Sequence, residues 1–290
     1  MKRILITGKQ GQVGWELQRT LASLGTIFAY DRSNLDLQNP IQICKTIREI
    51  QPHIIVNAAA YTAVDKAETD PEMANAVNAT APGILAEEAK KCGAILVHYS
   101  TDYVFDGTSP QPYTEADKTN PLNVYGKTKL EGEKAIQQIS GKHLIFRTSW
   151  VYGARGKNFL LTMLKLGKER ELLKIVNDQA GAPTWSRMIA EVTANILIDP
   201  KDSWGIYHLT SSGQTTWFEF AKKIFAKSQM GVTIQPISTS EYPLPAIRPK
   251  YSVLSNEKLK KTFQICLPDW EESLDKFYLS NGYTEVDSPP

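Results

Sequence analysis

The strongest constraint on the fold is a regular alternation of short apolar runs with longer segments that have helical spacing of apolar residues. The runs are RILITG, TIFAYD, HIIVNAAA, AILVHYS and KHLIFRTSWVYG, and the segments between them include GWELQRTLASLG, IQICKTIREIQP and PGILAEEAKKCG. Strands that are apolar on both faces belong to parallel sheets, because crossover helices cover both sides of such a sheet. The alternation therefore predicts an α/β fold with a doubly wound parallel sheet of the Rossmann type.

A glycine-rich turn follows the first of these strands. Gly8, Gly11 and Gly14 form a GxxGxxG pattern between the expected strand and the expected helix. Glycines let the backbone approach a pyrophosphate closely, and the helix N-terminus offers unpaired N–H groups. The same glycines could also serve only the geometry of a tight turn, so the pattern alone leaves both interpretations open.

An acidic residue ends the second strand and favours a dinucleotide. Asp31 follows the glycines by about 20 residues, where a carboxylate can bond the ribose of adenosine. Arg32 comes next and could instead hold a 2′-phosphate, so the choice between NADH and NADPH stays open. Asp36, in the loop SNLDLQNP, could cap a turn or contact adenine. After the third strand, NAAAYTAVD has small side chains that suit either a bound dinucleotide or close packing.

The alternation weakens after about Tyr152, and this suggests two domains. We expect residues 1–152 to form an NAD(P)-binding Rossmann domain that 184–211 rejoins, since MIAEVTANILI has helical spacing and GIYHLT resembles a strand. Beyond about Gly213 the chain is richer in proline, with EYPLPAIRPK at its centre. We expect 153–183 and 212–290 to form a smaller substrate-binding domain that closes over a cleft.

Composition and charge exclude several classes of partner. The formal net charge of the 290 residues is +2, without a basic run, so neither nucleic acid nor membrane is an expected partner. The three cysteines are widely separated, which fits a reducing compartment and predicts no metal site. His98 lies in an apolar run and is expected to be a hydrogen-bonded strand residue. No segment is apolar enough to cross a bilayer and MKRILITG is too short for a signal peptide, so we expect a cytoplasmic protein.

Polar residues with reactive potential lie beyond the fourth strand. Thr101 and Asp102 come at its carboxyl end, where open α/β sheets bind ligands. Tyr125 and Lys129 share one face of the next helix, being four residues apart. An ammonium group near a phenol lowers its pKa, and a hydroxyl such as that of Thr101 can bond a substrate oxygen. A YxxxK pair alone is often accidental, but in this context it predicts a general acid with its tuning cation.

Longer phrases give a resemblance to a known family. The glycine turn, STDYVFDG and YGKTK resemble the extended short-chain dehydrogenase/reductase superfamily. Over about Lys2 to about Trp270, the chain is similar to the dTDP-4-dehydrorhamnose reductase family in GQVGWELQ, VNAAAYTAVDKAE, HYSTDYVFDG, PLNVYGKTKLEGE, FRTSWVYG, NDQAGAPT and RPKYSVL. The resemblance implies NADPH or NADH as cofactor and a dTDP-sugar as substrate, reduced at its C4 ketone.

The resemblance also implies roles for particular residues. Tyr125 would donate the proton, Lys129 would tune it and hold the nicotinamide ribose, and Thr101 would bond the sugar ketone. Trp150 would pack on the sugar beside Asp102. Arg248 would contact the diphosphate, although a surface arginine held by prolines is an equal alternative. The implied cofactor contacts, besides Tyr125 and Lys129, are Gly8, Gly11, Gln12, Val13 and Gly14 near the pyrophosphate, Asp31, Asp36 and Leu37 near the adenosine, and Ala60, Tyr61, Thr62 and Tyr99 along the channel.

The same motifs and fold also fit functions other than that of a reductase. A nucleotide-sugar epimerase or dehydratase of the same superfamily would share these motifs. A non-catalytic subunit resembling the regulatory subunit of methionine adenosyltransferase would also share the fold. The family further implies a possible homodimer, which in some members is bridged by magnesium held by glutamates. Glu16 matches one such position, but Arg187 occupies the other, and a cation there argues against both the metal and that dimer.

Overall fold

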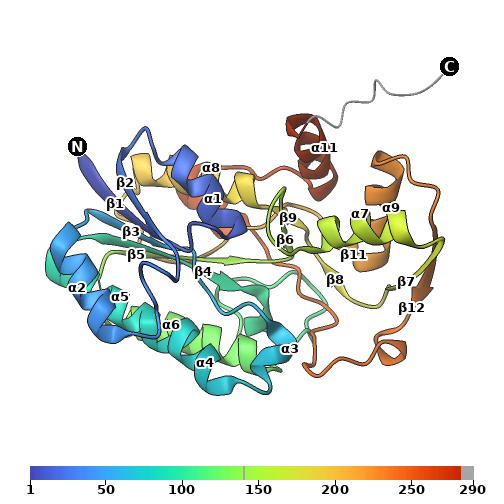
Figure 1. The fold of residues 1–290 in the computed structure, drawn as a ribbon, viewed down its shortest axis with the longest axis horizontal. Helices are drawn as coiled ribbons and strands as arrows, with labels where there is room; N and C mark the ends of the chain where they lie inside the picture. Colours follow the sequence, from blue (N-terminus) through green and yellow to red (C-terminus); the bar gives the residue numbers. More distant parts are fainter. Residues whose placement is uncertain (140, 282–290) are drawn as a thin grey trace.

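A six-stranded parallel sheet forms the centre of the protein (Figure 1). The computed structural model describes residues 1–139 and 141–281. The strand order is β10-β5-β4-β3-β1-β2, and every neighbouring pair is parallel. This order confirms the predicted fold class. The strands are β1 (Lys2–Thr7), β2 (Gly25–Tyr30), β3 (Ile54–Asn57), β4 (Ile95–Thr101), β5 (His143–Thr148) and β10 (Gly205–His208).

Helices cover both faces of this sheet, which explains why its strands are apolar on both sides. On one face Ile4 and Ile6 join the core beneath α1 and α8, whereas Leu5 joins the core beneath α2, α5 and α6 on the other. Successive side chains of a strand point to opposite faces, so this division follows from the pleat. Figure 1 shows the two helical layers above and below the sheet. Their bounds are α1 (Gln12–Thr20), α8 (Ser186–Ile198), α2 (Pro40–Ile50), α5 (Ala81–Cys92) and α6 (Val124–Ile139).

A second, smaller region lies beyond the carboxyl ends of the strands, at the right of Figure 1. Its β7 (Leu172–Val176) and β12 (Thr233–Ile237) pair in parallel, and α7 (Phe159–Glu169) packs on α9 (Trp217–Lys227). The remaining elements are short or terminal. They are α3 (Val64–Ala67), α4 (Pro71–Asn75), the π-helical η1 (Ala76–Thr80), η2 (Asp102–Val104), β6 (Val151–Tyr152), β8 (Ala180–Gly181), β9 (Thr184–Trp185), β11 (Thr215–Thr216), η3 (Thr239–Glu241), α10 (Glu257–Phe263) and α11 (Trp270–Ser280).

After leaving the large sheet at the end of β5, the chain returns to it at β10. Strand β10 pairs with β5, and α8 packs against α1. The segment 184–211 thus contributes one strand and one helix to the larger layer structure, while the proposed boundaries of the two domains stay a prediction. None of the helices among residues 1–139 and 141–281 is long and apolar enough to cross a membrane.

One expected strand is wrong. The run KHLIFRTSWVYG divides into two elements, because β5 ends at Thr148 and Trp150 adopts a left-handed backbone with φ of 47°. Beyond this break, β6 leaves the large sheet and pairs with β9. The pattern of apolar residues did not predict this break, because the break goes with contacts of the Trp150 indole to residues distant in the sequence.

A buried ion pair ties α6 to the sheet. Arg147 of β5 donates two hydrogen bonds to Glu133, at 2.7 and 2.9 Å, and Ser100 of β4 donates a third. Both charged side chains are almost fully buried, and the guanidinium carbon lies 5.2 Å from the centre of the Phe105 ring. Charges this deeply buried are tolerated only because they are paired and hydrogen-bonded. The ion pair therefore fixes the position of α6 relative to β4 and β5.

We expect Glu133→Gln to lower the free energy of unfolding by about 3 kcal/mol, because it leaves the Arg147 guanidinium buried without a counter-charge. Glu272→Gln is the matched control, since Glu272 forms a 2.8 Å ion pair with Lys276 in which both side chains are more than half exposed. That change should cost less than about 1 kcal/mol. Urea denaturation measures both, and equal losses would contradict a special role for the buried pair.

Candidate active site

The glycine turn between β1 and α1 is shaped by close backbone contacts. Gly8 has φ of 71°, and a Cβ built on it would lie 2.8 Å from the backbone nitrogen of Ala59. A Cβ on Gly14 would lie 2.1 Å from the carbonyl oxygen of Gly8. Gly8 therefore lets the turn pass against the segment after β3, and Gly14 lets α1 lie directly on the turn. Helix α1 begins at Gln12, after Gly11, without a side-chain cap.

A cavity of about 570 Å³ opens at the carboxyl ends of the parallel strands, beside this turn. This is the position at which open α/β sheets bind ligands. Gly14 does not line the cavity; its contact is with Gly8. The expected cofactor residues that do line it are Gly8, Gly11, Gln12, Val13, Asp31, Asp36, Leu37, Ala60, Tyr61, Thr62, Tyr99, Tyr125 and Lys129.

The end of β2 places charges of both signs at this cavity. Asp31 accepts hydrogen bonds from Ser33 Oγ at 2.5 Å and from Gln10 Nε2 at 2.8 Å, and Lys9 Nζ lies 3.2 Å away. These bonds, that of Ser33 most, lower the pKa of Asp31 and keep it anionic. The largely exposed Arg32 lies 3.7 Å from Asp36, whose carboxylate also accepts from the backbone of Gln38.

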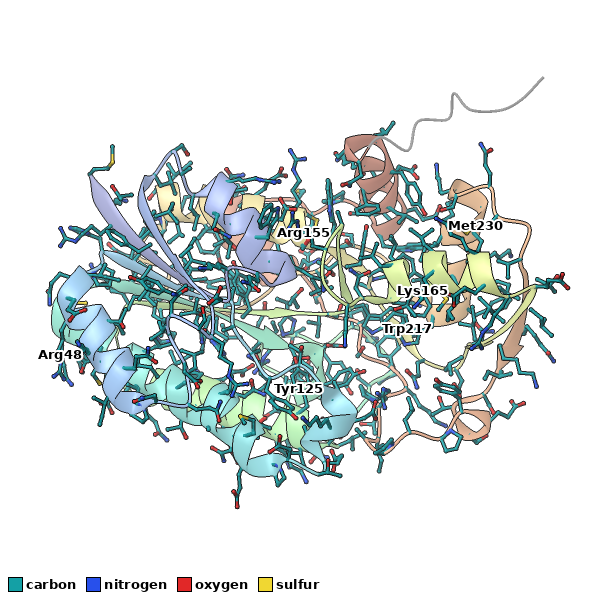
Figure 2. The ribbon with its side chains drawn as sticks, in the orientation of Figure 1. Arg48, Tyr125, Arg155, Lys165, Trp217 and Met230 are labelled. Atoms are coloured by element: carbon teal, nitrogen blue, oxygen red, sulfur yellow. The ribbon has the colours of Figure 1, made fainter. Side chains whose placement is uncertain are left out.

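A loop that the sequence did not indicate also borders the cavity. Gly156 and Lys157 line it, although they follow Tyr152 and lie outside the expected Rossmann segment. Asn158 fastens this loop to the glycine turn by donating to Gln12 Oε1 at 2.9 Å. The guanidinium of Arg155, which is labelled in Figure 2, lies 3.4 Å from the centre of the Trp15 ring. In the sequence, the run ARGKN, in which a glycine stands between two basic residues, could have indicated that this loop lies at an anion-binding site.

Tyr125 and Lys129 lie one turn apart at the start of α6, and both line the cavity. Burial raises the pKa of Tyr125 to about 12, against the opposing effect of a hydrogen bond with Thr101. Burial lowers the pKa of Lys129 to about 8, with Glu133 acting in the opposite direction. Burial, and not the neighbouring ammonium as expected, therefore sets the direction of the Tyr125 pKa in the protein alone. Tyr125 is protonated at neutral pH, as a proton donor must be.

Thr101 and Asp102 lie beside this pair, at the end of β4. Thr101 Oγ1 is 3.1 Å from Asp102 Oδ1, and it accepts a hydrogen bond from the Tyr103 backbone at 3.1 Å. Asp102 is almost completely buried. Burial raises the pKa of Asp102 to about 7, although hydrogen bonds with Ser252 and Thr101 lower it. A carboxyl group with this pKa is protonated in a large fraction of molecules at neutral pH and can then donate a hydrogen bond.

The other two expected substrate residues already have protein partners. The Trp150 indole stacks on Trp217, with ring centres 3.5 Å apart, and a Cβ on Gly181 would lie 2.4 Å from the same indole. The Arg248 guanidinium binds both carboxylate oxygens of Asp65, at 2.7 and 3.0 Å. Neither Trp150 nor Arg248 lines the 570 Å³ cavity, and neither do Thr101 and Asp102. Their roles toward a substrate stay predictions.

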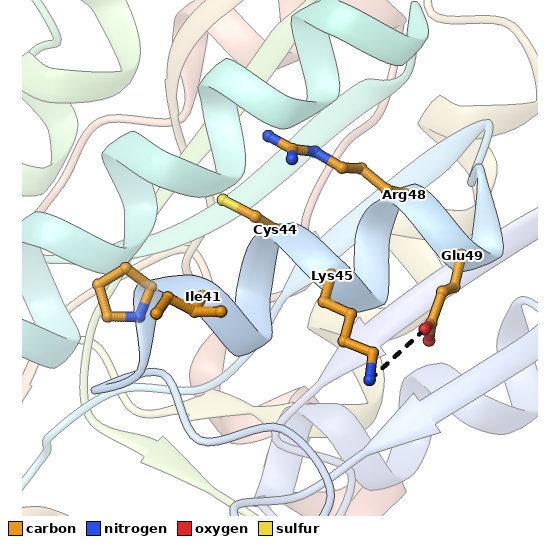
Figure 3. A pocket seen from close by; sticks show the side chains of 6 residues that line it. Ile41, Cys44, Lys45, Arg48 and Glu49 are labelled. Atoms are coloured by element: carbon orange, nitrogen blue, oxygen red, sulfur yellow. Dashed lines mark ion pairs between the residues drawn. The ribbon is translucent and has the colours of Figure 1, made fainter.

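A second hollow, on the outer surface of α2, offers less chemistry. Figure 3 shows its lining, in which Lys45 and Glu49 form a long ion pair of 3.9 Å. It lies on one helix, away from the carboxyl ends of the strands, and holds no acid–base pair comparable to Tyr125 and Lys129. We therefore take the cavity at the strand ends as the candidate active site.

Glu16 and Arg187 occupy the two positions that were compared with a magnesium site. Each already interacts within its own helix, Glu16 with Arg19 at 3.9 Å and Arg187 with Glu191 at 2.9 Å. Over residues 1–139 and 141–281, no group of three or more His, Cys, Asp or Glu side chains is arranged to hold a metal ion.

The fold is the one expected from the resemblance to extended short-chain dehydrogenase/reductase enzymes, and its cavity brings Tyr125 and Lys129 together with the glycine turn. Residues 1–281 match the family model described as the RmlD substrate binding domain. A dTDP-4-dehydrorhamnose reductase of Escherichia coli (strain K12) is 50% identical over 281 residues, which are 92% of this chain and 94% of that protein. The chain belongs to the dTDP-4-dehydrorhamnose reductase family, as its motifs predicted.

Solved structures agree with this assignment. The crystal structure of a dTDP-4-dehydrorhamnose reductase from Clostridium acetobutylicum has a TM-score of 0.93 and 41% identity, over 97% of this chain and 99% of that one. The enzyme from Bacillus anthracis, in complex with NADP, has a TM-score of 0.92 and 41% identity, over 96% and 99%.

We expect Gly8→Ala to destabilise the protein more than Gly93→Ala. Both glycines have a left-handed backbone, with φ of 71° and 68°, but a Cβ at Gly93 would meet no atom within 4 Å. Gly93→Ala should therefore cost only the backbone strain of about 1–2 kcal/mol. At Gly8, overpacking adds about 1–3 kcal/mol. Urea denaturation of the two variants gives the comparison, and equal losses would show that the turn tolerates a side chain.

Proposed function

We propose that this protein reduces the C4 ketone of dTDP-4-dehydro-β-L-rhamnose with NADPH or NADH, giving dTDP-β-L-rhamnose. The single observation that supports this most is that Tyr125 and Lys129 line the same cavity as the glycine turn, in a chain that is 50% identical to a curated reductase of this kind. The proposed binding partner is the dTDP-sugar. The proposed location is the cytoplasm, which the free thiols of Cys44, Cys92 and Cys266 support.

The cavity fits a dinucleotide by its own features. The uncapped start of α1 leaves backbone N–H groups for an anion, next to Gln12 and Val13 in the cavity wall. The turn approaches the segment after β3 so closely that a side chain at Gly8 would clash. Ala58, Ala59 and Ala60 of that segment also line the cavity, and their small side chains leave room for a ligand. These residues would hold the pyrophosphate and the adjoining ribose.

The chain's own residues can manage the proton of the reaction. When bound, the reduced nicotinamide supplies the hydride that adds to C4 of the sugar. Tyr125 donates its proton to the C4 oxygen as negative charge develops there, which is general acid catalysis. Lys129, one helical turn away, stabilises the resulting phenolate, and Thr101 orients the Tyr125 hydroxyl through the hydrogen bond between them.

The substrate side of the site is proposed to include Asp102, Trp150 and Arg248. Asp102 in its protonated form would donate a hydrogen bond to the sugar. Trp150 would use the part of its indole that Trp217 does not cover. Arg248 would bind the diphosphate only by sharing its guanidinium with Asp65 or leaving it. A homodimer, if formed, would need contacts other than magnesium bridging at Glu16, because Arg187 is a cation.

The proposed reaction predicts that Tyr125→Phe lowers kcat by about 10²-fold or more, because the variant keeps the ring but has no proton to donate. The assay follows loss of NADPH absorbance with dTDP-4-dehydrorhamnose. Tyr207→Phe is the control, since its hydroxyl donates to Ser203 at a distance from the cavity, and it should keep the wild-type rate.

The same assay separates the rival functions. A wild-type protein that binds NADPH without consuming it would contradict the reductase and favour the epimerase or the regulatory subunit. Co-purified NAD would then indicate the epimerase, and association with a synthetase the regulatory subunit. A Tyr125→Phe variant with the wild-type rate would leave the reductase intact but remove Tyr125 as the acid.

The charges at the end of β2 predict opposite changes in cofactor preference. Arg32→Ala should weaken binding of NADPH about tenfold and leave NADH nearly unchanged, because only NADPH carries a phosphate for the guanidinium. Asp31→Asn should weaken binding of NADH and not that of NADPH, since the lost carboxylate bonds a ribose hydroxyl but repels a phosphate. Fluorescence titration gives the dissociation constants. If either variant weakened the binding of NADPH and NADH by the same factor, the separate roles of Arg32 and Asp31 would be contradicted.

A further inference from the structure

A row of buried polar residues crosses three neighbouring strands beneath the cavity. Thr7 of β1 is in register with Asn57 of β3, and Asn57 is in register with His98 of β4. Thr7 Oγ1 and Asn57 Oδ1 are 2.6 Å apart, and Asn57 Nδ2 is 3.0 Å from His98 Nδ1. All three side chains are at most 2% exposed. Burying polar groups this completely destabilises the fold unless each of them is hydrogen-bonded. The row therefore suggests a role beyond packing.

The row ends on Lys129. His98 Nε2 lies 3.2 Å from Lys129 Nζ, which also donates to the Tyr99 carbonyl at 2.5 Å. An ammonium group has three N–H donors. With two of them bound to β4, the third remains for the cavity that Lys129 lines together with Tyr125. These two hydrogen bonds to β4 thus fix the direction in which the third N–H of the ammonium group points.

The charge on Lys129 determines how the row is hydrogen-bonded. An ammonium group only donates, so His98 Nε2 must accept and its proton must be on Nδ1. Nδ1–H then donates to the Asn57 amide oxygen, and the Asn57 amino group donates to Thr7. In the structure Asn57 has the other setting, with Thr7 Oγ1 donating to Asn57 Oδ1 and Asn57 Nδ2 next to His98 Nδ1. A half-turn of the amide, which exchanges its oxygen and nitrogen, gives the setting that the charged Lys129 requires. If Lys129 were neutral, all these bonds could run in the opposite direction.

The surroundings keep His98 uncharged. Burial, and next the positive charge of Lys129, lower its pKa well below the ordinary value. Its neighbour in β5 is the apolar Ile145, and the row on β3 and β1 adds only uncharged groups. Glu133, a turn further along α6, is the carboxylate among the described residues that acts on Lys129, and it is paired with Arg147. His98 can therefore act as an acceptor throughout the neutral range.

We propose that His98 is a positioning residue for Lys129, held in its Nδ1–H tautomer by Asn57 and Thr7 so that Nε2 accepts from the ammonium group and directs the remaining N–H into the cavity. Because it acts through the Tyr125–Lys129 pair, its effect on turnover rests on the proposed function. The tautomer itself does not, and it can be measured without substrate or cofactor.

The first test is the tautomer of His98 in the wild-type protein, from long-range ¹⁵N–¹H spectra of ¹⁵N-histidine-labelled protein. The chain has four histidines, and His98→Gln assigns the signal. The expected result at about pH 6.5 is a neutral ring with an unprotonated Nε2. A proton on Nε2, or titration near the ordinary pKa, would overturn the proposal, whatever the protein catalyses.

The second test compares His98→Leu with His98→Gln, whose amide oxygen can replace Nε2 as acceptor. Loss of the acceptor destabilises the charged form of Lys129 and lowers its pKa further. The alkaline limb of kcat/KM for NADPH oxidation should then shift by about one unit to lower pH in His98→Leu. His98→Gln should keep the wild-type limb. At about pH 9, above both limbs, His98→Leu should lose about tenfold in rate relative to His98→Gln.

A purely structural role for His98 would give another pattern. Both variants would lose stability in urea, and their alkaline limbs would coincide with that of the wild type, which would overturn the proposal. If the wild type does not oxidise NADPH, the proposed function fails, but the tautomer measurement still decides the role of His98.

Discussion

The placement of three ionisable residues on the buried face of α6 is the constraint on which the site depends. Tyr125, Lys129 and Glu133 follow one another at intervals of four, so they form one stripe along the helix. Each meets a partner on the sheet: Tyr125 meets Thr101, Lys129 meets the β4 groups, and Glu133 meets Arg147. The structural ion pair and the reactive pair are therefore parts of the same helix–sheet contact. The depth of burial that makes Glu133 an anchor also raises the pKa of Tyr125 and lowers that of Lys129.

Glycines also let the backbone of α6 come unusually near the short helices η2 and η1. A Cβ on Gly126 would lie 2.2 Å from the carbonyl oxygen of Tyr103, and one on Gly132 would lie 2.1 Å from that of Asn78. Gly8 and Gly14 play the equivalent part at the turn on the other side of the cavity. The glycine turn on one side of the cavity and helix α6 on the other thus both depend on glycines at points where two backbones meet.

Much of this organisation could be predicted from the sequence, because it follows from local patterns. Apolar runs that alternate with segments of helical spacing predicted the layers. The ends of the strands placed Asp31 and Thr101 at one edge of the sheet, and the helix that follows placed Tyr125 near them. What depends on distant contacts could not be read in this way. Lys157 borders the cavity only because Asn158 bonds Gln12, and the strand through KHLIFRTSWVYG breaks where the indole of Trp150 stacks on Trp217. Arg248 was expected to meet a diphosphate, but it pairs with Asp65, which is 183 residues away in the sequence.

The return of β10 to the large sheet has a consequence for how the chain acquires its structure. During synthesis, β5 emerges from the ribosome long before β10, and until β10 is made the outer side of β5 has no neighbouring strand. The apolar side of α1 likewise waits for α8, whose Ile189 belongs to the same core as Leu17. Such pairing between remote segments is slow because a long loop must close first. The growing chain therefore carries an exposed strand edge through much of its translation, and this interval is where aggregation competes with folding.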